Sequence, residues 1–405
     1  MSDLLLGIDM GTGSTKGVLT TTDGEIVATA SKSHAMSLPR PGWAEVDATT
    51  IWWGDLVEVA RQLMDERAGR PIAGMCVSGV GPCLLVCDEK LEPVRPAILY
   101  GIDGRAGAEI KELTERFGGR KILDRCGKAL STQAVGPKML WFRRHEPEAW
   151  ARGRRWYNSN SYVAAKLTGE YVLDHHTASQ SDPLYDVRAF DWAADWVPEV
   201  AGELEMPRLV WPHEVIGAVT EQAAAETGIP AGTPVSPGTV DAWAESFSAG
   251  VRQPGDLMLM YGSTMFFVEV LEEFRVQPKL WTTAGVQPDS YTLAAGMSTS
   301  GSLTTWLQEL TGGAPFVELV REASEIAPGS DGLITLPYFA GERTPIFDPR
   351  ARGVIAGLSL RHRRGHLFRS AYEGIAFGIR QIVEFLEEGG HPVTRLIAVG
   401  GGTKG

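Results

Sequence analysis

The chain has 405 residues, more than one hydrophobic core usually organises, and this length favours two domains of ordinary size. Its 38 basic and 50 acidic side chains give a net charge of −12. This balance argues against a nucleic-acid-binding surface and requires that any polyanion be held by a local site. The four cysteines have no C-x-x-C spacing, which argues against a zinc site and a disulfide framework. Without a secretory signal or a membrane-spanning run, we expect a soluble cytoplasmic protein with no membrane partner.

The most informative segment is the opening run LGIDMGTGSTKGVL at residues 6–19. An apolar strand delivers Asp9 directly into a turn of small residues, where backbone N–H groups can crowd around an anion. A carboxylate beside such a turn suits a site where a metal cation lies between them, as when the phosphates of a Mg-nucleotide are held. The turn could equally be an ordinary hairpin turn, because Gly, Thr and Ser are common there.

The segments that follow predict an α/β protein. Residues 18–31 continue the opening strand as an antiparallel meander, and Asp47 is placed to cap a helix with apolar residues at helical spacing. Residues 72–79 and 84–88 have the composition of strands. Helices are expected from Pro137 to His145 and from Ser159 to Leu167, the second ended by Gly169.

A second strand-turn-strand pattern occurs at residues 256–270, where YGST at 261–264 echoes the opening turn. The two halves therefore look like a pseudo-repeat, which predicts two related lobes with a cleft between them. The second copy has Met260 where the first has Asp9. Only the first lobe would then carry a metal ligand.

Asp241 stands at the junction of a short strand, a glycine turn and an apolar helix, within PVSPGTVDAWAESFSAG at residues 234–250. It could be a plain helix N-cap. It could also be a base that accepts a proton from a substrate hydroxyl, because a helix N-terminus would keep its carboxylate ionised.

The end of the chain combines a long helix from about His366, the strand RLIAV and the run GGGTKG. A strand that enters three glycines suggests either close approach of the backbone to a flat ligand or a simple turn.

On these blocks the chain resembles the FGGY family of carbohydrate kinases, in the actin-like ATPase superfamily. The segment from Gly353 to Glu373 resembles the family's C-terminal signature, and PKMLWFRRH at 137–145 resembles most of the N-terminal one, with Val135 as a departure. The turn after Asp9 is similar to the first phosphate motif, YGST to the second and GGGT at 400–403 to the adenosine motif. The resemblance covers the entire chain.

The resemblance implies two actin-like, ribonuclease H-like α/β lobes and transfer of the γ-phosphoryl group of ATP to a hydroxyl of a sugar or polyol. Asp241 matches the catalytic base, and Asp9 would act on Mg²⁺ through water. The positions implied to bind the nucleotide are Gly11, Thr12, Gly13, Ser14, Thr15, Lys16, Gly262, Ser263, Thr264, Gly301, Thr305, Gly401, Gly402 and Thr403. The helix start at Gly301 could also be only structural.

Residues 78–106 are most similar to xylulose kinases, but two substrate positions depart from their pattern. Those kinases have Met-His where this chain has Gly81-Pro82, and Asn where it has Ala242. Losing two polar partners should change sugar preference, because an unpaired buried hydroxyl costs about 1–3 kcal/mol. Asp103 and Arg105 are candidate sugar contacts or a surface salt bridge. Trp43 could stack on a sugar or merely pack.

We therefore expect residues 1–248 to form the N-terminal lobe, with sugar binding, phosphate binding and the catalytic Asp241, and residues 249–405 to form the nucleotide-binding C-terminal lobe. Family members continue beyond the triple glycine, so the resemblance implies a second lobe that is truncated at Gly405. The alternative function is an actin-like ATP-binding sensor or regulator without sugar phosphorylation. A small-molecule sugar or polyol is the expected partner, and a homodimer is left open.

Overall fold

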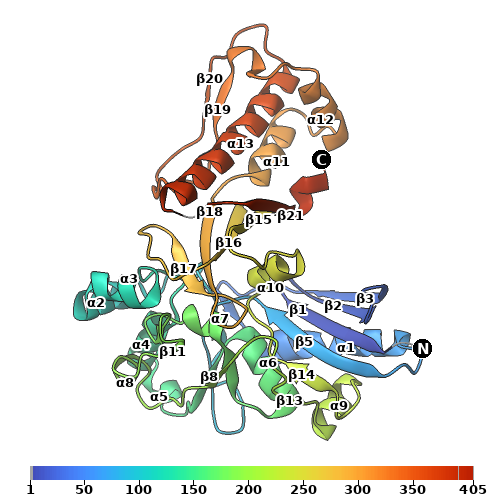
Figure 1. Ribbon diagram of the computed structural model, residues 1–405, viewed down its shortest axis with the longest axis vertical. Helices are drawn as coiled ribbons and strands as arrows, with labels where there is room; N and C mark the ends of the chain where they lie inside the picture. The colour runs from blue at the N-terminus through green and yellow to red at the C-terminus, as the bar shows by residue number, and fades with distance from the viewer. Residues whose placement is uncertain (1–2, 391, 405) are drawn as a thin grey trace. The chain divides into compact units, whose positions relative to one another are not determined.

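The computed structural model describes residues 3–390 and 392–404 (Figure 1). Contacts between Cα atoms divide the chain into two compact units. Unit 1 comprises Met1–Glu245 and Thr283–Ser290, and unit 2 comprises Ser246–Thr282 and Tyr291–Gly405. Each unit is described by itself below.

Unit 1 is built on a six-stranded sheet with the order β13-β14-β5-β1-β2-β3. The predicted meander is confirmed, since β1 (Leu4–Met10), β2 (Ser14–Thr21) and β3 (Ile26–Ser33) pair antiparallel. On the other side of β1, β5 (Ile72–Gly79) and β14 (Pro234–Ser236) run parallel to it, and β13 (Gly217–Ala218) forms the edge. The carboxyl ends of β1, β5 and β14 therefore lie at the same edge of the sheet.

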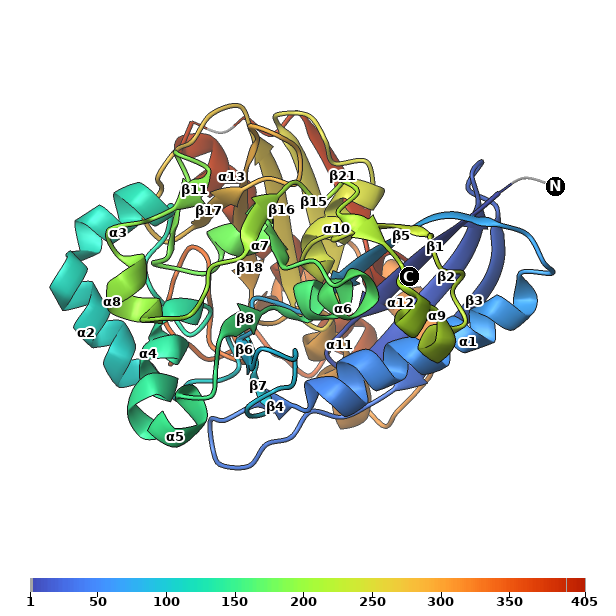
Figure 2. The same cartoon turned by 90° about the horizontal axis from the view of Figure 1, so that it is seen from below.

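Helix α1 (Gly54–Glu66) packs on β2 and β3 and lies along this sheet in Figure 2. Asp47 caps the π-helical turn Ala48–Trp53 that leads into α1, so its predicted capping role is confirmed. Helix α6 (Ser159–Thr168) ends at Gly169 in the left-handed conformation, as expected, and contacts β5 and β14. The buried side chains of Leu6, Ile8, Leu56 and Val59 belong to the core between these layers.

Further helices and short strands of unit 1 lie outside this sheet. The helices are α2 (Gly107–Phe117), α3 (Gly119–Cys126), α4 (Val135–His145), α5 (Pro147–Trp150), α7 (His175–Ser179), α8 (Val197–Ala201) and α9 (Glu221–Thr227). The strand pairs are β4 (Glu45–Val46) with β7 (Ala97–Ile98), β6 (Leu85–Cys87) with β8 (Arg155–Tyr157), β9 (Val172–Asp174) with β12 (Arg208–Val210), and β10 (Tyr185–Asp186) with β11 (Asp191–Trp192).

Unit 2 contains a five-stranded sheet with the order β17-β18-β16-β15-β21. Its strands are β15 (Asp256–Tyr261), β16 (Met265–Leu271), β17 (Trp281–Ala284), β18 (Tyr291–Met297) and β21 (Arg395–Val399). Helices α11 (Gly301–Leu310), α12 (Phe316–Ser324) and α13 (Arg364–Glu388) pack together beside the small sheet of β19 (Ile334–Leu336) and β20 (Val354–Ala356), as Figure 1 shows. The long helix expected from about His366 begins two residues earlier, at Arg364.

The predicted pseudo-repeat is visible in the two turns. Gly11 N–H donates to Ser14 O at 2.9 Å between β1 and β2, and Gly262 N–H donates to Thr264 O at 3.0 Å between β15 and β16. In each unit a parallel strand, β5 or β21, then pairs with the first strand of the hairpin. The same local pairing thus occurs twice in the chain.

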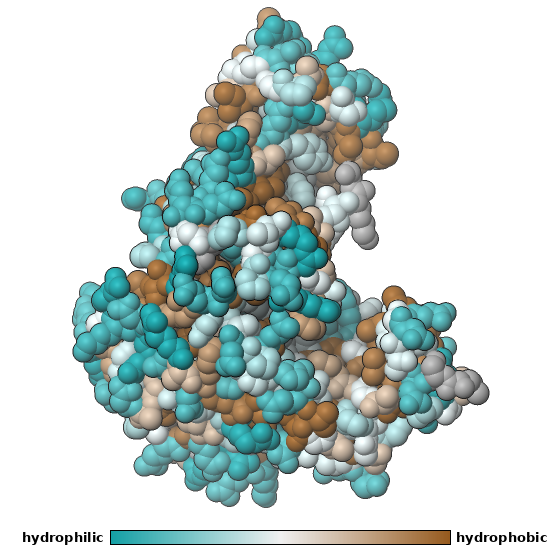
Figure 3. Space-filling model, in the orientation of Figure 1, coloured by the Kyte–Doolittle hydropathy of each residue, from teal (hydrophilic) through white to brown (hydrophobic). Residues whose placement is uncertain are grey.

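The face drawn in Figure 3 is largely hydrophilic, with separate hydrophobic patches. Among the described residues, no helix is both long and apolar enough to cross a membrane. Three of the four cysteines are buried and Cys76 is exposed, and all four are free thiols, in agreement with the sequence.

Candidate active site

Asp9 and Ser78 lie side by side at the carboxyl edge of the unit 1 sheet. They are register partners on β1 and β5, and Ser78 Oγ donates to Asp9 Oδ1 at 2.7 Å. Within the described part of the chain, Asp9 Oδ2 has no hydrogen-bond partner. One carboxylate oxygen is thus fixed and the other is open. Ser78 is a site residue that sequence reasoning missed, although the predicted strand at 72–79 already placed it at this edge.

The turn after Asp9 is held by its own backbone and by His34. Gly11 closes the turn onto Ser14 O, and His34 N–H donates to Gly13 O at 3.0 Å. The His34 ring donates to Gly11 O from Nε2 at 3.1 Å and to Asp55 Oδ2 from Nδ1 at 2.7 Å. Asp55 belongs to α1, so the histidine ties the turn to that helix. No short motif in the sequence indicated this tie.

The predicted phosphate-binding residues of this turn differ in whether their polar groups are open to an anion. In the part of the chain that the structure describes, the backbone N–H groups of Thr12 and Gly13 have no acceptor, so they are open to an anion. Lys16 is exposed and lies opposite Asp9 on β2. The side chain of Thr15 is completely buried, however, and the nucleotide contact expected for it stays a prediction.

Asp241 is the first residue of helix α10 (Asp241–Ser248) and not its N-cap, which corrects one reading of the sequence. Its Oδ1 accepts a hydrogen bond from the N–H of Ala242 at 2.8 Å. Burial raises the pKa of Asp241 to about 7, and the negative charge of Asp9 adds to the rise. Desolvation thus opposes the stabilisation that the helix N-terminus was expected to give this carboxylate. A carboxylate with a pKa near 7 is suited to accept a proton at neutral pH.

A third carboxylate, Glu245, lies one helical turn after Asp241. Its pKa is also raised, by burial and then by the charge of Asp9. No cluster of three or more His, Cys, Asp or Glu side chains among residues 3–390 and 392–404 could hold a metal ion by itself. Mg²⁺ commonly takes one or two carboxylates together with phosphate and water oxygens. The open Oδ2 of Asp9 fits such a ligand set.

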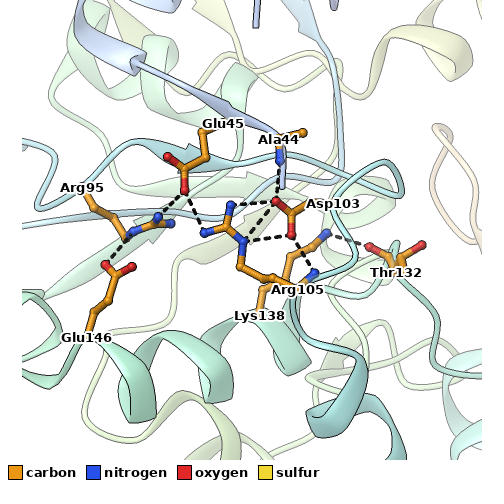
Figure 4. A network of polar contacts seen from close by, with 8 residues as sticks. All are labelled: Ala44, Glu45, Arg95, Asp103, Arg105, Thr132, Lys138 and Glu146. Carbon is orange, nitrogen blue, oxygen red and sulfur yellow. Dashed lines mark hydrogen bonds and ion pairs between the residues drawn. The ribbon is translucent and has the colours of Figure 1, made fainter. Parts of the chain in front are cut away.

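Asp103 and Arg105 form a buried ion pair, so the surface salt bridge considered from the sequence was wrong. Both side chains are 0% exposed, with Arg105 Nη2 at 2.7 Å from Asp103 Oδ2. Asp103 Oδ2 also accepts from Ala44 N–H at 2.7 Å, and Arg105 Nη1 lies 2.8 Å from Glu45 Oε1. Figure 4 shows this network extending through Glu45 to Arg95.

Aromatic rings complete the enclosure of Arg105. Its guanidinium carbon lies 3.9 Å from the ring centre of Trp43 and 4.9 Å from that of Trp141. Trp43 therefore packs on Arg105, and its stacking on a sugar stays a prediction. Lys138, also in Figure 4, is buried next to this network and donates to Thr132 O at 2.8 Å. Burial lowers the pKa of Lys138 to about 8.

Gly81 and Pro82, the candidate substrate positions, follow β5 at the same edge. A Cβ atom on Gly81 would lie only 2.9–3.0 Å from Val240 and from the amide of Asn158. Glycine is therefore required here by packing inside unit 1. Tyr100, from the segment that leads to Asp103, places its hydroxyl 3.1 Å from Thr12 Oγ1 and so lies next to the turn after Asp9. Tyr100 was not selected from the sequence as a site residue.

In unit 2 the turn at Gly262, Ser263 and Thr264 is fastened to the start of α11. Gly301 N–H donates to Gly262 O at 3.0 Å, and a Cβ on Gly301 would lie 2.7 Å from that oxygen. Gly301 is thus required for close packing of the backbone. The hydroxyl of Thr305 donates to Gly301 O within the same helix.

The triple glycine of unit 2 packs partly against the protein itself. A Cβ on Gly402 would lie 2.4 Å from the ring of Tyr261, whereas Gly401 has open space around it. Thr403 Oγ1 donates to Gly400 O at 2.8 Å. Gly402 is therefore close to the ring of Tyr261, and the flat ligand expected next to these glycines stays a prediction.

Two family models match almost the whole chain. The model described as the FGGY family of carbohydrate kinases, N-terminal domain, matches residues 4–248, and the corresponding C-terminal domain matches residues 257–405.

Individual relatives agree with this assignment. The chain is 30% identical to a xylulose kinase of Lactococcus lactis, over 99% of this chain and 80% of the relative. It is 25% identical to a gluconokinase of Bacillus subtilis, over 99% of this chain and 80% of that one. Among solved structures, the xylulose kinase from Rhodospirillum rubrum has a TM-score of 0.91 and 34% identity, covering 99% of this chain and 82% of that chain. The chain therefore belongs to the FGGY family of carbohydrate kinases and is a sugar kinase.

Proposed function

We propose that the protein transfers the γ-phosphoryl group of ATP to a hydroxyl of a ketose or polyol, with Asp241 as the base. The observation that carries this proposal is the pair of carboxylates at one sheet edge, Asp241 with a pKa near 7 and Asp9 with one open oxygen. A proton acceptor and a cation ligand are the two charged groups that phosphoryl transfer to an alcohol needs.

In this proposal different residues of unit 1 act as the base, the phosphate contacts and the Mg²⁺ ligand. Asp241 orients the acceptor hydroxyl and takes its proton, while the open N–H groups of Thr12 and Gly13 hold phosphate oxygens. Asp9 Oδ2 would hold Mg²⁺ through water, and Lys16, opposite Asp9 on β2, would contact a phosphate oxygen. The ion, when bound, neutralises charge on the phosphates. Residues 1–248 would thus carry the sugar, the phosphate turn and the base.

The nucleotide would be held by residues 249–405. Gly262, Ser263 and Thr264 form the second turn of the pseudo-repeat, and Gly401 offers open backbone for the base of ATP. Gly301, Gly402 and Thr403 serve that site indirectly, since their own contacts are with the protein.

The acceptor is proposed to differ from D-xylulose, although the relatives named above include xylulose kinases. Gly81, Pro82 and Ala242 offer no side-chain hydrogen bond to a sugar hydroxyl. Asp103 and Arg105 would support the pocket from within, because both side chains are buried in their own ion pair. A ketose or polyol with a smaller need for polar partners fits these residues better.

The test is an ADP-release assay on a panel of pentuloses, hexuloses, tetruloses, polyols and gluconate, with and without Mg²⁺. We expect turnover to rise by orders of magnitude with one acceptor and to require Mg²⁺. D-xylulose as the best acceptor would contradict the inference from the pocket. ATP turnover that no acceptor stimulates would favour the ATP-binding sensor.

A further inference from the structure

A chain of buried polar side chains lies behind the segment that leads into Asp241. Asp174, at the end of β9, and Asn158 and Asn160, at the start of α6, form its centre. Each is at most 1% exposed. The segment 237–240 connects β14 to α10 and rests on these side chains.

Asp174 holds this segment directly. Its Oδ1 accepts from Thr239 Oγ1 at 2.7 Å and from the N–H of Thr177 at 2.9 Å, and its Oδ2 accepts from Asn160 Nδ2 at 3.2 Å. Asn160 Nδ2 also donates to Pro237 O at 3.2 Å. The segment is thus fastened at two points, by the carbonyl of Pro237 and by the hydroxyl of Thr239, which lie three residues and one residue before Val240, the residue that precedes α10.

The same chain of side chains reaches the segment that contains Gly81 and Pro82. Asn158 Nδ2 donates to Asn160 Oδ1 at 2.7 Å, and Asn158 Oδ1 accepts from Cys83 N–H at 2.7 Å. Ser159 Oγ donates to Val80 O at 2.6 Å. One network therefore fixes both the approach to Asp241 and the candidate substrate segment.

A buried polar network stabilises the folded state less than apolar side chains that fill the same space. A carboxylate at zero exposure loses its hydration, and apolar side chains would fill the same space without that loss. Its benefit is geometric, because a fully satisfied buried network allows only one arrangement of the groups it holds. The groups held here are the two segments that carry the proposed reaction.

We propose that Asp174 is a positioning residue, which acts through Thr239 and Asn160 to set the place of Asp241 relative to the acceptor segment 80–83. This inference rests on the proposed role of Asp241. Asp174 itself contacts neither the substrate nor the phosphates. Removing a single member of the network should therefore reduce the rate of the chemical step more than it reduces binding.

The sharpest test is Thr239→Val, which removes one hydroxyl and keeps the size of the side chain. We expect kcat to fall about 10- to 100-fold, with the KM for ATP unchanged within about twofold. Thr239→Ser restores the hydroxyl and should recover most of the rate. Thr227→Val is the matched control, since Thr227 is equally buried in unit 1 and its hydroxyl donates to Ala223 O in α9, away from this network.

Thr239→Val and Thr227→Val should lower the melting temperature by similar amounts, and only the first should lower kcat. If Thr239→Val keeps the kcat of the wild type while Asp241→Asn is inactive, the positioning role is overturned and the proposed function stands. If Asp241→Asn has the kcat of the wild type, the proposed function, with Asp241 as the base, is contradicted, and the positioning role loses its basis. Asp174→Asn gives a second test, because its amide would meet the amide of Asn160, and we expect a larger loss of kcat than with Thr239→Val.

Discussion

Ser78 Oγ donates to Asp9 Oδ1 at 2.7 Å across the β1–β5 pairing, and this hydrogen bond leaves Oδ2 as the open oxygen of the carboxylate. The relationship depends on strand register, since Asp9 and Ser78 are direct partners at the ends of two parallel strands. A serine at this position orients the carboxylate in the way that groups behind a metal ligand usually do.

Ser78→Ala should therefore weaken the use of Mg²⁺ while preserving the fold. Loss of a group that orients a metal ligand typically costs about 10- to 100-fold in metal affinity. We expect the Mg²⁺ concentration for half-maximal rate to rise by about that factor, as measured in a titration at saturating ATP. Ser370→Ala, at a buried serine of α13, is the control and should leave the Mg²⁺ dependence unchanged. An unchanged Mg²⁺ titration in Ser78→Ala would show that Ser78 does not orient Asp9 for Mg²⁺ binding.

Asp241→Asn should keep the fold and lower kcat by about 10²- to 10⁴-fold, the usual range for a lost general base. The amide still fits at the start of α10, but it cannot take a proton from the acceptor. Circular dichroism checks the fold, and a steady-state assay with the best acceptor measures kcat. A variant that turns over like the wild type would show that Asp241 is not the base.

The sequence predicted the features that depend on neighbouring residues. The hairpin after Asp9, the capping by Asp47 and the short strand, turn and helix around Asp241 all follow from local patterns of apolar residues, glycines and capping side chains.

What the sequence could not show depends on burial and on distant partners. Asp103 and Arg105 resemble a surface pair in the sequence, and only the packing of Trp43 and Trp141 on Arg105 reveals that the pair is enclosed. The raised pKa of Asp241 could not be predicted for the same reason, because desolvation arises from the tertiary structure. Ser78 and His34 lie far along the chain from the groups they hold or orient, so no short motif contains them.

The tie between His34 and the turn predicts an effect on nucleotide binding. The double variant His34→Phe/Asp55→Leu removes both hydrogen bonds of the ring and leaves no unpaired buried carboxylate. Since each of the two lost hydrogen bonds is worth about 0.5–1.5 kcal/mol, we expect the KM for ATP to rise by about 5-fold to at most about 150-fold.

Lys32→Met is the matched control for this experiment. Lys32 on β3 pairs with Glu58 on α1 at 2.6 Å, so its loss breaks a different link to the helix that holds Asp55, without touching the turn. The KM for ATP should stay at the wild-type value in this variant. Equal KM values in the double variant and the control would contradict a role for His34 in holding the turn.

Glu269 predicts a pH-dependent loss of stability in unit 2. It is 1% exposed on β16, and its Oε2 has no hydrogen-bond partner among the described residues. Burial, with a smaller contribution from the charge of Glu387, raises its pKa to about 8. In the unfolded chain the pKa of a glutamate is about 4.3. The folded protein thus keeps a proton that the unfolded chain releases, so stability falls as the pH rises from about 4 to about 8 and then levels off.

Glu269→Gln removes this titration and should raise the melting temperature at pH 8 relative to the wild type, with a smaller difference at pH 5. The gain is at most about 1.4 kcal/mol for each pH unit within that range. Melting curves at pH 5, 6, 7, 8 and 9 measure it, and the exposed Glu272→Gln serves as the control. A difference between Glu269→Gln and the wild type that is the same at pH 5 and pH 9 would show that Glu269 does not carry a raised pKa.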